Sequence, residues 1–182
     1  HVARSNPVRT ALLLPWLLVG SALNAARPAE AWSLNCLLVP LTFLSSESRR
    51  AHVDAEFVAS FRGRLHAHPR VRARLEEHLA QGSAVFIVSG SPESLVRAVY
   101  PELASRTGVQ ILGSTMRRGP HATCLLDRCI GEGKRRMLEQ RFGEGIRFEC
   151  GYGDSESDAP VFALCSRAFR VTRRGDIVSR DD

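Results

Sequence analysis

The stretch GYGDSESDAP, residues 151–160, places three acidic residues within five positions, directly after an apolar segment. Asp154, Glu156 and Asp158 permit two interpretations. In the structural one, a strand ends here and an Asp or Ser caps the next helix, whose first turn favours acids. In the chemical one, the crowded carboxylates repel one another unless a cation is present, and hard oxygen ligands suit Mg²⁺. Taken alone, the stretch does not choose between a helix cap and a magnesium site.

Two other short segments have residue types that suit a phosphoryl group. VSGSPES, residues 88–94, ends an apolar run with Ser89 and Gly90. A hydroxyl and free backbone N–H groups at a helix start can bind an anion there. GEGKRR, residues 131–136, lets glycines bring Lys134 close to a site, although it does not match the Walker A pattern. Each segment by itself favours the simpler alternative, a capping serine in the first case and a solvated lysine in the second.

The composition limits the partners that such a site could serve. The 182 residues carry a net charge of +6, which favours an anionic partner such as a phosphate ester, an acidic lipid surface or nucleic acid. The arginines are scattered and the chain has only two tyrosines, so no stacking platform is evident and we expect no nucleic-acid partner. The five cysteines include no CxxC pair, which indicates reduced thiols rather than a disulfide framework or a zinc site.

These residues must be positioned by secondary-structure elements, and helices and strands alternate from about residue 69 onward. That alternation predicts an α/β fold with a parallel sheet. A continuous apolar run of β-branched residues, AVFIVSG, is typical of a buried parallel strand. The expected helices are 46–66, 69–82, 92–100, 131–143 and 159–167, and the expected strands are 84–90, 109–114, 122–130, 146–154 and 168–172.

The N-terminal part of the chain is apolar and has a helical pattern. Its two apolar runs, 11–26 and 34–44, each contain a proline and are shorter than the roughly 18 to 20 residues that a membrane-spanning helix needs. One alternative is a pair of buried helices in a helical subdomain. The other is a hairpin that dips into a membrane surface, anchored by Trp16 and Trp32 and flanked by arginines.

The order and spacing of the three segments resemble the haloacid dehalogenase-like (HAD) phosphohydrolases. The shared pattern is a strand ending in Ser-Gly, then a glycine-flanked lysine, then a strand followed by G-D-x-x-x-D. The resemblance implies that Ser89 and Gly90 bind the transferring phosphoryl group and that Lys134 neutralises its charge. It also implies that Asp154 and Asp158 hold Mg²⁺. These roles suit phosphoryl transfer, which depends mostly on positioning and charge neutralisation.

Within that family the chain looks most like the phosphatidylglycerophosphatase C group of bacterial enzymes. This resemblance implies a helical cap at residues 1–66, with association with a membrane as one alternative, and an α/β phosphatase core at 67–182. It further implies that the substrate is phosphatidylglycerophosphate and that the protein lies at the cytoplasmic face of the inner membrane, or alternatively in the cytoplasm. The stretches that carry the resemblance are LLLPWLLVG, FLSSESRRAHVDAEFVASF, VFIVSGSPESLVRAVY, CIGEGKRRMLEQRFG and RVTRRGDI.

The sequence departs from the family in one motif. The family's D-x-D-x-T supplies a nucleophilic aspartate and an acid/base, and the 182 residues contain no such motif. The resemblance places the first core strand, which carries it, ahead of His1, so we expect this chain to be inactive by itself. The expected function is that of a magnesium-dependent phosphomonoesterase. The alternatives are a non-catalytic phosphate- or lipid-binding relative and a phosphatase for a soluble ester.

Overall fold

The computed structural model of the chain describes residues 13–43, 46–62 and 68–180. The chain divides into two compact units, each of which is described by itself. The first comprises His1–Leu65 with Ser114–Arg128, and the second comprises His66–Gly113 with Cys129–Asp182. The expected division into a cap at 1–66 and a core at 67–182 stays a prediction, and the segment 114–128 groups with the N-terminal helices.

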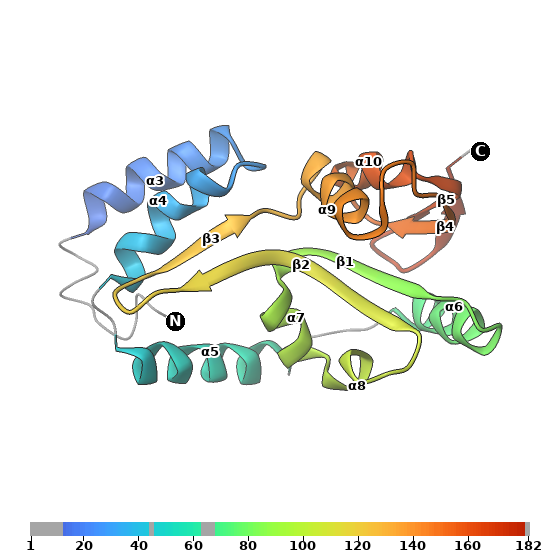
Figure 1. Ribbon diagram of the computed structural model, residues 1–182, viewed down its shortest axis with the longest axis horizontal. Coiled ribbons are helices and arrows are strands. Elements are labelled where there is room, and N and C mark those ends of the chain that lie inside the picture. Colours follow the sequence, from blue (N-terminus) through green and yellow to red (C-terminus); the bar gives the residue numbers. More distant parts are fainter. Residues whose placement is uncertain (1–12, 44–45, 63–67, 181–182) are drawn as a thin grey trace. The chain divides into compact units, whose positions relative to one another are not determined.

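The first unit combines helices with a β-hairpin (Figure 1). The hairpin is formed by the second half of β2 and by β3, which pair antiparallel with Met116 opposite Leu125. An irregularity of register between Thr115 and Met116 interrupts the pairing. The elements of this unit are α3 (Leu14–Ala26), α4 (Ala31–Thr42), α5 (Glu47–Arg62), β2 (Val109–Arg118, shared with the second unit) and β3 (Thr123–Asp127).

Side chains of α4 satisfy the outer edge of β3. The Asn35 amide donates to the Leu125 carbonyl at 2.8 Å and accepts from the Leu125 N–H at 2.7 Å. The Thr42 hydroxyl accepts from the Thr123 N–H at 2.9 Å. Unpaired backbone groups at a strand edge are costly to bury, so these polar side chains let an apolar helix cover the strand.

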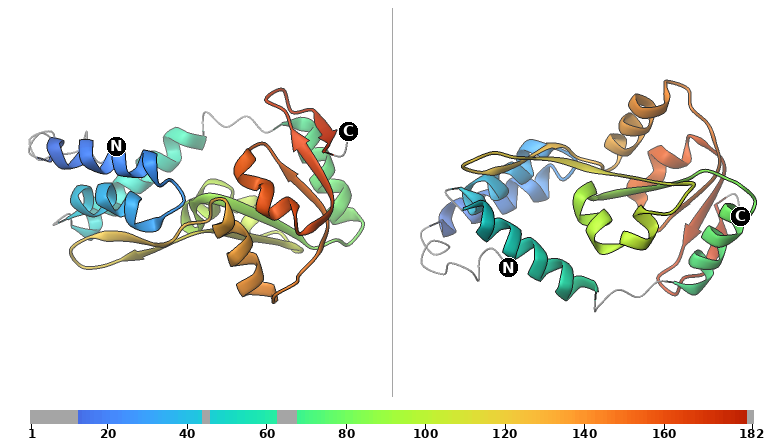
Figure 2. Two further views of the ribbon diagram at one scale, coloured as in Figure 1. Left: turned by 90° about the horizontal axis from the view of Figure 1, so that it is seen from above. Right: turned by 60° about the horizontal axis from the view of Figure 1, so that its bottom comes forward.

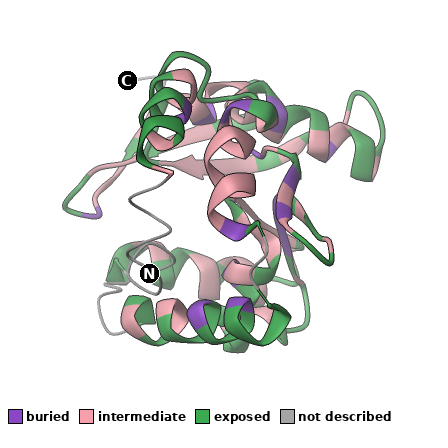
Figure 3. Cartoon of the chain, turned by 90° about the vertical axis from the view of Figure 1, so that its left-hand side faces the viewer, coloured by how far each residue is buried: buried purple, intermediate pink, exposed green. Residues whose placement is uncertain are grey.

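The apolar helices of this unit leave large side chains exposed. Trp16 is 66% exposed, Leu18 is 64% exposed and Trp32 is 48% exposed. Figure 3 shows the corresponding scarcity of buried residues along the helices. The choice between a pair of buried helices and a membrane-surface hairpin stays a prediction. None of the described helices is both long enough and apolar enough to cross a membrane.

The second unit is mixed α/β and contains the predicted site residues. Figure 2 shows its short helices beside the strands, with α10 against β4 and β5. Its elements are α6 (Pro69–Ala80), β1 (Val85–Pro92), α7 (Glu93–Val99), α8 (Pro101–Ala104), α9 (Glu132–Phe142), β4 (Phe148–Gly153), η1 (Glu156–Asp158), α10 (Ala159–Phe162), β5 (Cys165–Val171) and β6 (Ile177–Ser179).

The described strands form two three-stranded sheets, ordered β1-β2-β3 and β4-β5-β6. β4 and β5 run parallel, with Phe148 opposite Cys165, and β6 adds an antiparallel edge. β1 and β2 begin side by side, because the Val85 N–H donates to the Gly108 carbonyl at 2.8 Å. Parallel strands joined through helices are what the alternating pattern predicted, so the α/β fold class is confirmed.

The core of the second unit joins both of its sheets. Leu138 of α9 is 1% exposed and forms an apolar cluster with Leu112 of β2 and Leu164, just ahead of β5. Aromatic rings close the cluster: Phe86 of β1 lies 5.5 Å from Phe148 of β4, centroid to centroid, in an edge-on contact. The predicted helix 131–143 is therefore the element whose apolar face packs against strands of both sheets.

One predicted helix is wrong in its extent. The segment 159–167 was expected to be helical throughout, but α10 ends at Phe162 and β5 begins at Cys165. Pairing with β4 overrides the local helical preference of this segment, because a strand beside β4 satisfies its backbone and buries its apolar side chains. The short elements α8 and β6 were not predicted.

The central position of Leu138 gives a first prediction. Leu138→Ala should lower the free energy of unfolding by about 2–5 kcal/mol, since it removes buried methyl groups and leaves a cavity. Chemical denaturation followed by circular dichroism measures the change. Val178→Ala is the control in the same unit, because Val178 is 46% exposed and should cost less than about 0.5 kcal/mol. Equal losses in the two variants would show that the cluster does not hold the unit together.

Candidate functional site

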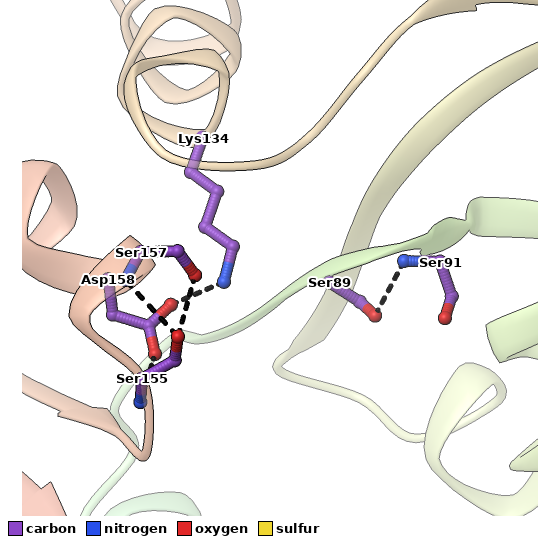
Figure 4. Close-up of polar contacts among 6 residues, drawn as sticks. All are labelled: Ser89, Ser91, Lys134, Ser155, Ser157 and Asp158. Carbon is purple, nitrogen blue, oxygen red and sulfur yellow. Dashed lines mark hydrogen bonds and ion pairs between the residues drawn. The ribbon is translucent and has the colours of Figure 1, made fainter. Parts of the chain in front are cut away.

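Lys134 and Asp158 form an ion pair inside the second unit. Lys134 lies in the first turn of α9, which follows Gly131, a residue with a φ of 56°. Its Nζ donates to Oδ1 of Asp158, and the two side chains are only 12% and 11% exposed. Figure 4 shows the lysine reaching from its helix toward the acidic turn. Lys134 is therefore not the solvated lysine that the sequence left open as an alternative.

Asp158 also takes part in a helix cap, in which the N-cap residue is Ser155. Its Oδ2 accepts from the Ser155 N–H at 3.2 Å, and the Ser155 hydroxyl accepts from the Ser157 N–H at 3.2 Å, which together form a capping box at η1. The structural interpretation of the acidic stretch is therefore correct for Asp158. This does not exclude the chemical interpretation, a magnesium site, because the Asp158 carboxylate also lies close to Gly153, the last residue of β4.

Gly153 allows this close approach, which the sequence analysis missed. A Cβ on Gly153 would lie 2.6 Å from Oδ2 of Asp158, so any larger residue would displace the carboxylate. Gly153 is the glycine of the G-D-x-x-x-D pattern, and its place in that pattern could have identified it from the sequence. The last residue of β4 is thus small because the acidic turn folds back onto it.

Asp154 lies apart from this pair. It is exposed, in the bend between β4 and η1. Its carboxylate takes part in no hydrogen bond or ion pair with the described residues. The structure thus brings Lys134 and Asp158 together and leaves Asp154 facing solvent next to them in sequence.

Ser89 and Gly90 lie near the end of β1. The Ser89 hydroxyl accepts from the Ser91 N–H at 3.2 Å, which is a local turn contact (Figure 4). A Cβ on Gly90 would lie 3.0 Å from the Ile130 side chain, so the segment before α9 passes close to β1 here. Ser89 makes no direct hydrogen bond to Lys134 or Asp158 in the described structure.

Cys129 connects the three segments. It is fully buried, and burial raises the pKa of its thiol to about 11, so it is neutral at physiological pH. The Ser89 backbone bonds to this thiol, and the charges of Lys134 and Asp158 also act on its pKa. Residues of all three predicted segments thus influence the pKa of this one thiol. No pattern in the sequence indicates this position of Cys129, because an isolated cysteine between loops has no distinctive signature.

The predicted donors for a metal ion are two carboxylates, those of Asp154 and Asp158. Among residues 13–43, 46–62 and 68–180, no three His, Cys, Asp or Glu side chains are grouped so as to hold a metal ion. Mg²⁺ needs fewer protein ligands than that, because it commonly keeps several waters and binds one or two carboxylates together with substrate phosphate. Asp154, just after β4, and Asp158, in η1, are two carboxylates of that kind, and their binding of Mg²⁺ stays a prediction.

The buried ion pair gives a second prediction. Lys134→Met should lower the free energy of unfolding by about 3–5 kcal/mol, because it leaves the Asp158 carboxylate buried without its cation. Urea unfolding measures the loss, and the double variant Lys134→Met with Asp158→Asn should recover part of it. The control is Arg135→Met, which breaks an exposed pair with Glu139 on the same helix and should change stability far less. The pair would be energetically unimportant if the two single variants lost the same stability.

Comparison with known proteins bears on the family of the chain. The model of the haloacid dehalogenase-like hydrolase family matches residues 3–163, a range that includes Ser89, Lys134, Asp154 and Asp158. No solved structure matches the chain significantly. Because the family model covers most of its length, the chain belongs to the haloacid dehalogenase-like hydrolases.

Proposed function

We propose that this chain carries the phosphate-binding and charge-neutralising part of a magnesium-dependent phosphomonoesterase. The observation that carries the proposal is the buried pair of Lys134 and Asp158 at the end of β4. Burying an ammonium beside a carboxylate costs desolvation free energy. The binding of an anionic ligand such as phosphate offsets that cost. The net charge of +6 also favours an anionic substrate.

Each predicted site residue has a separate role in this proposal. Ser89 donates its hydroxyl to a phosphoryl oxygen, and Gly90 lets the phosphoryl group approach the backbone. Lys134 neutralises the charge that develops on the equatorial oxygens. Asp154 and Asp158 would hold Mg²⁺, which when bound supplies further positive charge to the phosphoryl group. The neutral thiol of Cys129 adds no negative charge to this anion site.

The covalent step needs a group that these residues do not provide. Asp158 is engaged by Lys134 and by Ser155, and the 182 residues contain no D-x-D-x-T. We attribute the nucleophilic carboxylate to a segment outside these residues and propose that the 182-residue chain alone has no phosphatase activity. The absent motif also favours a second candidate, a non-catalytic relative that binds phosphate or lipid head groups.

Binding and turnover together test this proposal. Isothermal titration with inorganic phosphate and Mg²⁺ should detect binding to the chain, and Lys134→Met should weaken it about tenfold or more, because it removes a charge-assisted hydrogen bond. Arg135→Met is the matched control and should bind as the wild type does. Phosphate binding without hydrolysis of p-nitrophenyl phosphate is the expected result. Hydrolysis by the 182-residue chain would contradict the assignment of the nucleophile, and absence of phosphate binding would contradict the site itself.

The proposed substrate is an anionic phospholipid, phosphatidylglycerophosphate, at a cytoplasmic membrane surface. The sequence resemblance supports this choice over a soluble ester. So do the exposed apolar side chains of α3 and α4, because Trp16, Leu18 and Trp32 are side chains that partition into a lipid interface. Arg27, just beyond α3, could contact acidic head groups.

Vesicles of phosphatidylglycerol and phosphatidylcholine test the lipid proposal. The emission of the two tryptophans should shift to the blue when vesicles are added, and Trp16→Ser with Leu18→Ser should weaken sedimentation with vesicles severalfold, because less apolar surface enters the interface. Val178→Ser removes an apolar residue of the second unit that is 46% exposed, and it should leave sedimentation with vesicles unchanged. Unchanged emission in the wild type, with phosphate binding retained, would favour a soluble phosphate ester.

A further inference from the structure

Arg128 is a partly buried cation of the first unit that the proposed phosphate site does not use. It follows β3 directly and precedes Cys129 in the chain. Its Nη1 donates to the side-chain oxygen of Asn24 at 2.7 Å. Among the described residues, Asn24 is its only hydrogen-bond partner and no carboxylate pairs with it. The guanidinium is therefore held by a neutral amide rather than by an acid.

The surroundings of Arg128 fix the position of this charge. The side chains of Asn35 and Thr42, both in α4, hydrogen-bond to the backbone of β3. Figure 1 shows β3 beside α4. Asn24 lies in the last turn of α3 and holds the arginine just beyond the end of the strand. A side chain that is already held in place loses little conformational entropy when a ligand binds.

The hydrogen bond to Asn24 leaves one edge of the guanidinium for a ligand. The N–H groups of Nε and Nη2 form this edge, which suits two oxygens of an anionic group. Burial lowers the pKa of the Arg128 guanidinium below its usual value, so the charge has lost part of its hydration. Arginine stays protonated in proteins, and an anion at this edge would replace the lost water.

The charge and the neighbouring helix indicate which anion fits. One guanidinium matches one negative charge, which is the charge of a phosphodiester, whereas a phosphomonoester carries about 1.5 to 2 at neutral pH. The helix that supplies Asn24 also exposes Trp16 and Leu18, side chains that partition into a lipid interface. Trp16 lies about 12 Å from Asn24 along the axis of α3. A phosphodiester close to apolar groups is the chemistry of a phospholipid.

We propose that Arg128, oriented by Asn24, binds the phosphodiester of an anionic phospholipid. The guanidinium donates through Nε and Nη2 to the two non-bridging oxygens of the diester, while the acyl chains stay in the lipid interface. This site lies in the first unit and uses neither Lys134 nor Asp158. The choice of a phospholipid rests on the proposed function, but the binding of a phosphodiester by Arg128 does not.

Titration of the 182-residue chain with a monomeric short-chain phospholipid tests this site. The probe is dihexanoyl phosphatidylglycerol, followed by isothermal titration calorimetry below its micelle concentration. Arg128→Gln should weaken binding about tenfold or more, because it removes a charge-assisted contact through two hydrogen bonds. Arg117→Gln is the matched control, because it removes the same charge from an exposed position of the same hairpin. The control should bind within about twofold of the wild type.

A second variant, Asn24→Asp, separates anion binding from a structural role. It places a carboxylate against the guanidinium, which keeps Arg128 in position but neutralises its charge. Lipid binding should therefore fall about tenfold while chemical denaturation shows no loss of stability. A structural role, as a cation near the C-terminal end of α3, predicts unchanged lipid binding in this variant. Asn24→Asp also keeps the test decisive if Arg128→Gln does not fold.

Other ligands identify the source of the phosphodiester. Dimethyl phosphate, a free phosphodiester, should bind more weakly than the lipid because it lacks apolar groups. Dihexanoyl phosphatidylcholine should also bind more weakly, because its choline cation offsets the charge of the phosphate. Inorganic phosphate with Mg²⁺ should bind Arg128→Gln as it binds the wild type. That last titration reports on the site around Lys134, so failure of the proposed function and failure of this inference are distinguishable.

Several outcomes would overturn the inference. Equal lipid affinity of Arg128→Gln and the wild type would exclude Arg128 from the site, and full affinity of Asn24→Asp would show that its charge is not recognised. Equal affinity for dimethyl phosphate and the lipid would make this a site for soluble esters. Loss of inorganic phosphate binding in Arg128→Gln would assign the arginine to the phosphomonoester instead. Absence of lipid binding to the wild type would also contradict it, whatever the phosphate titration shows.

Discussion

The buried contact between the Lys134 ammonium and the Asp158 carboxylate is the constraint on which the rest of the second unit depends. Removing two charges from water is costly, and their contact and the capping N–H of Ser155 offset that cost only if α9 and η1 are held in place. The core around Leu138 fixes α9, and the absence of a Cβ at Gly153 lets Asp158 approach β4. The same constraint puts a positive charge where a phosphoryl group could bind.

The strand edges show a second constraint, which is the need to satisfy backbone groups. In the first unit, Asn35 and Thr42 act in place of a neighbouring strand and let an apolar helix cover β3. In the second unit, the corresponding edges of β1 and β4 face a mostly apolar cavity instead. β3 is thus closed by side chains of its own unit.

Local sequence patterns predicted most of the elements near the site. The helix after Pro69 ends close to Gly82, as its proline and glycine signals indicate, and the apolar run that ends at Ser89 is β1. The prediction was wrong at 159–167, where four residues are helical and a strand soon follows. The composition of residues 159–167 suits either a helix or a strand. Only the presence of β4 beside this segment decides that a strand forms from Cys165.

The sequence by itself determined the α/β class, the family resemblance and the identity of the polar residues, because periodicity, turn residues and motif spacing are local properties of the chain. Tertiary structure alone decided which of those residues meet. Lys134 pairs with Asp158 across 24 positions while Asp154 stays exposed, and the buried Cys129 has a pKa that residues of all three segments influence. Such contacts depend on how α9 packs against both sheets, and no short stretch of sequence encodes the packing of distant elements.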